Sequence, residues 1–193
     1  RRLRERLLTD FHHAAESTYR LSIKSIEKAG LAEEQRLKRE RLKQWLDEQV
    51  RAETGGKRLK DEQREQLEQR HLHAAIKLAA ATFLNRLVVI KQLEAQGLRQ
   101  IKIVTGGWNS SGYRDFREFA PDLCRHDQET EGYDGLLLKL LYDELALELP
   151  GLFGRVGVTE LFPVMGSTLR AVVEALDALA PDVWLDDTTL GWV

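Results

Sequence analysis

The chain has 193 residues, of which 42% are hydrophobic and 31% are charged, so it is long enough to bury a hydrophobic core as one domain, or one domain with an extension. Its net charge of −2 is spread unevenly, with +4 on residues 1–75 and −6 on residues 76–193. This balance argues against a strongly basic, dedicated DNA-binding domain, although the N-terminal part is compatible with nucleic acid. The single cysteine, Cys124, excludes an internal disulfide and fits a reducing cytoplasm.

The first 30 residues predict an N-terminal helix that has apolar side chains near one face and ends at Gly30. This segment is charged and amphipathic, and it lacks the apolar stretch of a signal peptide. The chain begins with Arg1 rather than Met, and residues 186–189 (DDTT) have the composition of a helix N-terminus close to the last residue, Val193. We therefore expect the chain to be a piece of a longer protein.

Residues 31–71 are too polar for a globular core, because 21 of these 41 residues are charged. A helix over 31–53 carries only a thin apolar seam, the sequence Thr54-Gly55-Gly56 interrupts it, and Asp61 is a good N-cap for the next helix. The segment therefore predicts a charged helical hairpin that projects from the rest of the chain.

Cations gather at two places in this hairpin, one along its first helix and one at the turn. Two interpretations are open: a solvated helix face with alternating charges, or contacts with the phosphates of a DNA duplex. The candidate phosphate contacts are Arg36, Lys38, Arg39, Lys57, Arg58 and Lys60.

Residues 72–97 predict a central buried helix, around which the other elements pack. Apolar residues recur at helical spacing, and between residues 78 and 90 only Thr82, Asn85 and Arg86 are polar. If the helix runs without a break from Asp61 to Gln96, it is about 54 Å long at about 1.5 Å per residue. The apolar run is shorter than the ~20 residues of a membrane span and contains an arginine, so we expect no membrane contact.

The three polar residues of this helix, Thr82, Asn85 and Arg86, lie three and four positions apart and share one face. A buried arginine needs carboxylate or carbonyl partners, because an unpaired buried charge is costly. Asp143 and Glu144, in a helix predicted over 135–149, are the candidate partners. The network either docks a neighbouring helix or contacts a cofactor or nucleic acid through a groove.

The rest of the chain predicts short elements: a strand at 101–104, a glycine-rich loop at 106–112, and helices at 113–119, 135–149 and 167–179. Ser167 is the expected cap of the last of these helices, and residues 122–134 are expected to form a loop. The predicted fold is mainly α, with at most one or two short strands. Its parts are an N-terminal helix (1–30), a charged hairpin (31–71) and a helical body (72–193).

No arrangement of residues predicts an active site in this chain. Glu68 and His71 have the spacing of a di-iron motif, but that chemistry needs a second motif and further carboxylates. Cys124, His126 and Asp127 are too few ligands for a strong metal signal. The glycines at 106, 107 and 112 do not match a dinucleotide-binding or Walker loop. We expect no catalytic, cofactor-binding or metal-binding residue.

Four segments nevertheless resemble large adenine-specific DNA methyltransferases. Residues 82–97 (TFLNRLVVIKQLEAQG) resemble the Asn-Arg-Leu helix that precedes the catalytic core in the methyltransferases of type IIG restriction–modification systems and of BREX phage defence (the PglX type). Three further segments resemble the BREX branch in particular, and they are residues 104–118 (VTGGWNSSGYRDFRE), 142–153 (YDELALELPGLF) and 186–193 (DDTTLGWV).

The resemblance implies that this chain is the N-terminal, non-catalytic helical region of such an enzyme, truncated before the methyltransferase domain. The family's catalytic domain binds S-adenosylmethionine and methylates adenine through an Asn-Pro-Pro-Tyr-type motif, which generally requires flipping of the base. Neither that motif nor the family's glycine-rich loop is in this sequence, so no catalytic residue is carried over. The implied partners are double-stranded DNA, through the parent enzyme, and other phage-defence proteins. The alternative is a non-catalytic helical module that binds a protein and makes no DNA contact.

Overall fold

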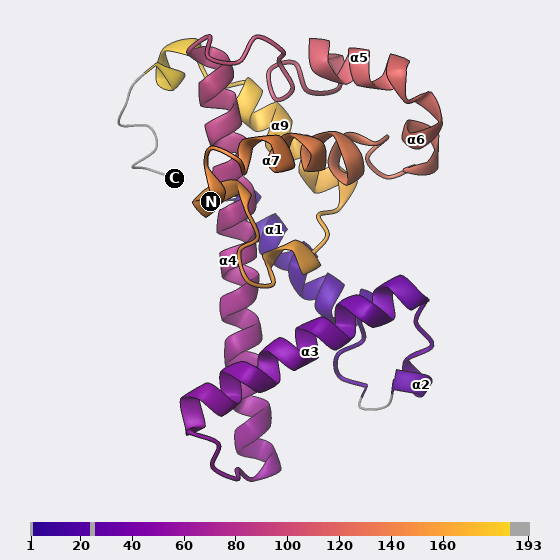
Figure 1. Cartoon of the computed structure of the whole chain (residues 1–193), viewed down its shortest axis with the longest axis vertical. Coiled ribbons are helices and arrows are strands. Elements are labelled where there is room, and N and C mark those ends of the chain that lie inside the picture. The colour runs from indigo at the N-terminus through magenta and orange to yellow at the C-terminus, as the bar shows by residue number, and fades with distance from the viewer. Residues whose placement is uncertain (1, 24–25, 186–193) are drawn as a thin grey trace. The chain divides into compact units, whose positions relative to one another are not determined.

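The computed structural model describes residues 2–23 and 26–185, and the described residues form helices and turns without a strand. The longest element is α4 (Asp61–Ala95), which is 35 residues long (Figure 1). The prediction of a mainly α fold around a central buried helix is confirmed. The chain divides into two compact units, and the boundary lies within α4, between Ala81 and Thr82. The sequence had placed a boundary ten residues earlier, at residue 71.

The N-terminal unit comprises Arg4–Ala81 and Val156–Pro163. It contains most of α1 (Arg2–His13), a π-helical turn (Ala14–Thr18), α2 (Ile26–Ala29), α3 (Glu33–Thr54), the first part of α4 and a 3-10 turn (Thr159–Leu161). The single N-terminal helix expected over 1–30 is therefore shorter than predicted. It ends because the Tyr19 N–H bonds back to the Ala14 carbonyl and Arg20 adopts a left-handed conformation, with φ of 48°.

The charged hairpin consists of α3 and the first turns of α4, and it breaks where the sequence predicted. Gly55 and Gly56 have φ of 60° and 77°, which favour glycine, and they end α3. The thin apolar seam is buried, at Leu42, Leu46 and Val50. Salt bridges join the two helices at Asp47–Arg64 and Glu53–Arg70. In each pair the two residues are 17 positions apart in the sequence. If the helices ran strictly antiparallel, residues that face each other would be farther apart in the sequence the farther they lie from the turn. The two helices therefore cross at an angle (Figure 1).

Burial along α4 follows the predicted apolar stripe. The side chains of Leu72, Ile76, Ala80, Phe83, Leu87 and Ile90 are all buried. By length and composition alone α4 also resembles a membrane span, since an 18-residue window has a mean hydropathy of 1.4. Half of that window is buried inside the protein, and a buried core helix has the same composition.

Of the described residues, the C-terminal unit comprises residues 2–3, 82–155 and 164–185. After α4 come α5 (Ser111–Phe119), α6 (Pro121–His126), a π-helical segment (Tyr133–Leu138), α7 (Lys139–Leu145), α8 (Pro150–Phe153) and α9 (Gly166–Asp177). Short 3-10 turns cover Gly107–Asn109 and Pro181–Trp184.

Several local predictions in this unit were wrong. The expected loop at 122–134 begins with α6, and the helix expected over 135–149 starts as a π-helical segment and ends at Leu145. The N-cap of α9 is Met165 rather than Ser167. Residues 101–104 form no strand. The N–H groups of Ile103 and Val104 bond to the carboxylate of Glu94, and that of Lys102 bonds to the hydroxyl of Ser111, instead of to a neighbouring strand. The helix start expected at residue 186 lies outside the described residues.

Candidate nucleic-acid interface

Figure 1 shows the loop that joins α3 to α4. Three cations lie within four residues in this loop. The side chains of Lys57, Arg58 and Lys60 are exposed. Within residues 2–23 and 26–185, none of the three forms a salt bridge. We call these three residues the hairpin-tip cations. Their charges are free to contact an anionic partner.

The cations predicted on α3 are placed differently. Arg36 pairs with Glu40 at 3.1 Å, and Lys38 pairs with Glu34 at 2.6 Å. Both are ion pairs within one helix that stay exposed, and such pairs contribute little to stability. A phosphate would have to compete with a carboxylate for each of these two cations.

Arg39 is unsuited to contact DNA, because its side chain is fully buried. Its guanidinium donates hydrogen bonds to the carbonyl oxygens of Tyr19 and Ile23. Arg39 thus joins α3 to the irregular segment that follows the N-terminal helix. The prediction of Arg39 as a phosphate contact was wrong, because Arg39 lies three residues before Leu42 and so falls on the buried seam of α3.

Arg86, in the predicted polar network of α4, is buried as expected, with 6% of its surface exposed. Its Nε donates to the Leu152 carbonyl at 2.8 Å, and its Nη2 donates to the Gly154 carbonyl at 2.7 Å. Its guanidinium also lies 4.9 Å from the centre of the Tyr142 ring. Arg86 therefore fixes the turn around α8 against α4. Gly154 is needed there, because a Cβ atom would lie 2.4 Å from the Pro150 carbonyl oxygen.

The acidic partners predicted for Arg86 were wrong. Glu144 forms a two-pronged pair with Arg99, at 3.1 and 3.3 Å, and Asp143 is exposed. Thr82 is buried and Asn85 is half-buried, but no hydrogen bond of either side chain is seen in the described part of the chain. Of the predicted network only Arg86 has the expected kind of partner, and its partners are backbone carbonyls. Arg86 therefore docks the turn around α8 and does not line a groove.

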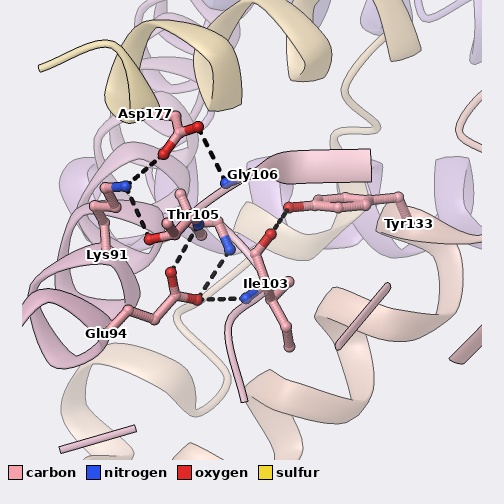
Figure 2. Close-up of polar contacts among 8 residues, drawn as sticks. Lys91, Glu94, Ile103, Thr105, Gly106, Tyr133 and Asp177 are labelled. Carbon is pink, nitrogen blue, oxygen red and sulfur yellow. Dashed lines mark hydrogen bonds and ion pairs between the residues drawn. The ribbon is translucent and has the colours of Figure 1, made fainter. Parts of the chain in front are cut away.

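A second buried network in α4 had not been predicted, and Figure 2 shows it. The carboxylate of Glu94 is only 3% exposed. One of its oxygens accepts hydrogen bonds from the N–H groups of Ile103 and Val104, at 2.6 and 2.9 Å, and the other accepts from the N–H of Thr105 at 2.7 Å. Tyr133 donates its hydroxyl to the Ile103 carbonyl at 2.7 Å. Residues 103–105 thus use one carboxylate as the hydrogen-bonding partner that a neighbouring strand would otherwise supply.

Lys91 and Asp177 complete this network (Figure 2). The Lys91 ammonium donates to the Thr105 hydroxyl at 2.8 Å and to Asp177 at 2.6 Å, and the other oxygen of Asp177 accepts from the Gly106 N–H at 3.0 Å. Burial pushes the pKa of Asp177 up, but the hydrogen bonds from Lys91 and Gly106 outweigh it and hold the pKa below its usual value. The network joins α4, the loop after it and α9 within the C-terminal unit, and every charge in it has a partner.

Asp134, at the start of the π-helical segment, has an unusual carboxyl group. Burial, followed by the charges of Asp127 and Glu129, raises its pKa to about 6. A raised pKa means that the folded chain binds this proton more tightly than the unfolded chain. The protonated carboxyl group therefore stabilises the folded chain fully when the pH is below 3.8, the ordinary pKa of an aspartate. This stabilisation is lost as the pH rises through about 6.

We expect Asp134→Asn to stabilise the chain at pH 7.5 by roughly 1–2 kcal/mol, because it removes a charge that is poorly solvated in the fold. The gain should shrink between pH 7 and pH 4.5, which urea unfolding at several pH values will measure. Asp115→Asn, at an exposed position of α5, is the matched control and should show no such trend. Parallel pH curves for Asp134→Asn and the unchanged chain would contradict the assignment.

Among the described residues, no group of three or more histidine, cysteine, aspartate or glutamate side chains could hold a metal ion. Asp127, once a candidate ligand, instead accepts hydrogen bonds from the Thr130 and Gly132 N–H groups. Burial raises the pKa of the Cys124 thiol, which keeps it protonated and unreactive. A groove of about 540 Å³ beside α3 and α4 is lined mostly by charged side chains.

Comparison of the chain with protein-family models, with curated proteins and with solved structures finds no match.

Proposed function

We propose that this chain is a non-catalytic helical module that holds duplex DNA through the hairpin-tip cations, within a site-specific DNA adenine methyltransferase of a phage-defence system of the BREX or restriction–modification type. The observation that carries the DNA contact is the exposure of Lys57, Arg58 and Lys60 within four residues, without salt bridges in the described part of the chain. Their position at a turn lets all three approach one partner.

The chemistry of the hairpin-tip cations fits phosphate rather than bases. Lysine and arginine at a turn supply positive charge and several N–H donors, which is what a phosphate backbone recruits. The hairpin presents no exposed aromatic side chain for stacking, since Trp45 is half-buried in the α3 seam. The contact is therefore expected to position DNA without reading its sequence.

The assignment to a methyltransferase rests on the four segments that resemble that family, three of which contain residues of the buried networks. Arg86 and Glu94 lie in the first segment, Thr105 and Gly106 lie in the second, and Leu152, which accepts a hydrogen bond from Arg86, lies in the third. In this proposal these residues build a rigid body beside the catalytic domain. Binding of S-adenosylmethionine, base flipping and methyl transfer belong to the rest of the parent enzyme. We propose a cytoplasmic location for the parent, with other phage-defence proteins as further partners.

A protein-docking role without DNA contact is the second candidate, and exposed apolar side chains favour it. Phe119, at the end of α5, is 91% exposed, and Leu123, in the next helix, is 50% exposed. Leu147, after α7, is 85% exposed. Side chains of this kind are typical of surfaces that another protein covers.

Binding of this chain to a labelled DNA duplex separates the two candidates. We expect weak binding at low salt, and we expect the triple variant Lys57→Ala, Arg58→Ala, Lys60→Ala to lose at least about tenfold in affinity, because three phosphate contacts are removed. The charge-matched control is Arg114→Ala, Arg117→Ala, Lys139→Ala, which removes three exposed cations of the C-terminal unit.

The control is expected to lose much less affinity, because Asp115 and Glu118 each follow one of its arginines and weaken the local potential. Equal losses in the two triple variants would show that binding reflects net charge and not the hairpin tip. No binding to DNA at low salt would favour the protein-docking role.

A further inference from the structure

Two histidines that are 61 residues apart meet on the surface of the N-terminal unit. The Nε2 atom of His12, in α1, lies 3.3 Å from the Nδ1 atom of His73, in α4. The ring centres are 5.4 Å apart, and the ring planes are inclined by 32°. Both side chains are exposed, so an ion in solution can reach them.

This separation suits a metal ion as well as it suits a hydrogen bond. Zinc binds histidine nitrogen at about 2.0–2.1 Å in a tetrahedral arrangement, which places two ligating nitrogens about 3.3 Å apart. In the free protein one ring donates its proton to the other. Metal binding requires a lone pair on both facing nitrogens, so the donating ring must carry its proton on its other nitrogen instead.

The surroundings of the pair also suit a cation. Partial burial and the neighbouring His73 lower the pKa of His12, which favours the neutral form that binds metal. Glu16, in the π-helical turn, lies close enough for its charge to act on His12. This negative charge favours a cation beside His12.

We propose that His12 and His73 form a two-histidine site for a divalent transition-metal ion such as Zn²⁺. Water molecules complete the coordination, because two imidazoles fill only half of a tetrahedral shell. The bound ion would link α1 to α4 and stabilise the folded N-terminal unit, since an unfolded chain does not hold the two rings together. This proposal does not depend on DNA contact or on the methyltransferase assignment.

Calorimetric titration of the whole chain with ZnCl₂ tests the site. We expect one ion to bind per chain and the midpoint of thermal unfolding to rise with the Zn²⁺ concentration. His12→Ala and His73→Ala should each weaken binding at least about tenfold, since each leaves only one imidazole. His126→Ala, an exposed histidine of the C-terminal unit, is the matched control and should bind as the unchanged chain does.

Histidine-ring NMR of the unchanged chain gives a readout that does not depend on whether the variants fold. Zn²⁺ should shift the ring signals of His12 and His73 together and leave those of His126 in place. Absence of binding up to about 1 mM Zn²⁺, a Kd limit that corresponds to very weak association, would overturn the proposal. Equal affinity in His12→Ala, or loss of binding in His126→Ala, would also overturn it.

Discussion

Glu94→Ala is expected to lower the free energy of unfolding by about 4 kcal/mol, because two buried N–H groups and one partly buried N–H group lose their common acceptor, and each unpaired group costs roughly 1–3 kcal/mol. The groups are those of Ile103, Val104 and Thr105. Helix propensity contributes little, since alanine and glutamate both favour helices. Urea unfolding, followed by circular dichroism, measures the loss.

A conservative variant separates the hydrogen bonds from the volume of the side chain. Glu94→Gln keeps one oxygen as an acceptor, but its amide NH₂ group replaces the other oxygen and faces a backbone N–H, so that two donors meet. We therefore expect the free energy of unfolding to fall by about half as much as in the alanine variant. Glu118→Ala, at an exposed position of α5, is the control and should change stability by less than about 0.5 kcal/mol. A loss below about 1 kcal/mol for Glu94→Ala would show that residues 103–105 do not depend on this carboxylate.

Arg86→Met is expected to lower the free energy of unfolding by about 3 kcal/mol. Methionine fills much of the same volume, but the carbonyls of Leu152 and Gly154 lose their charged donors. The exposed Arg114→Met in α5 serves as the control. If both variants unfold at the same urea concentration, Arg86 is solvated and does not hold the turn around α8.

The central helix was predictable because its signal is periodic and long. Apolar residues at helical spacing define α4, and glycines at 55, 56 and 97 mark where helices end. Each of these features is local, so the sequence alone identifies it. The end of the first helix near Tyr19 was missed, since no glycine or proline stands there and the left-handed residue is Arg20.

Partners of the buried charges were much harder to predict. The sequence indicated that Arg86 needs acceptors, but the acceptors are backbone carbonyls, which have no sequence signature. Glu94 lies near the end of an apolar helix. An acidic residue at such a position could have predicted a carboxylate that accepts hydrogen bonds from backbone N–H groups. The pairing of His12 with His73 depends on how α1 packs against α4, which no local pattern encodes.

The salt dependence of duplex DNA binding tests the proposed function most directly. Each phosphate contact contributes about −0.9 to the slope of log K against log salt concentration, so three contacts contribute about −2.7. We predict that the triple variant Lys57→Ala, Arg58→Ala, Lys60→Ala binds with a slope shallower by about that amount than the unchanged chain. Equal slopes for the two proteins would contradict the account, because they would show that the hairpin-tip cations release no counterions from DNA.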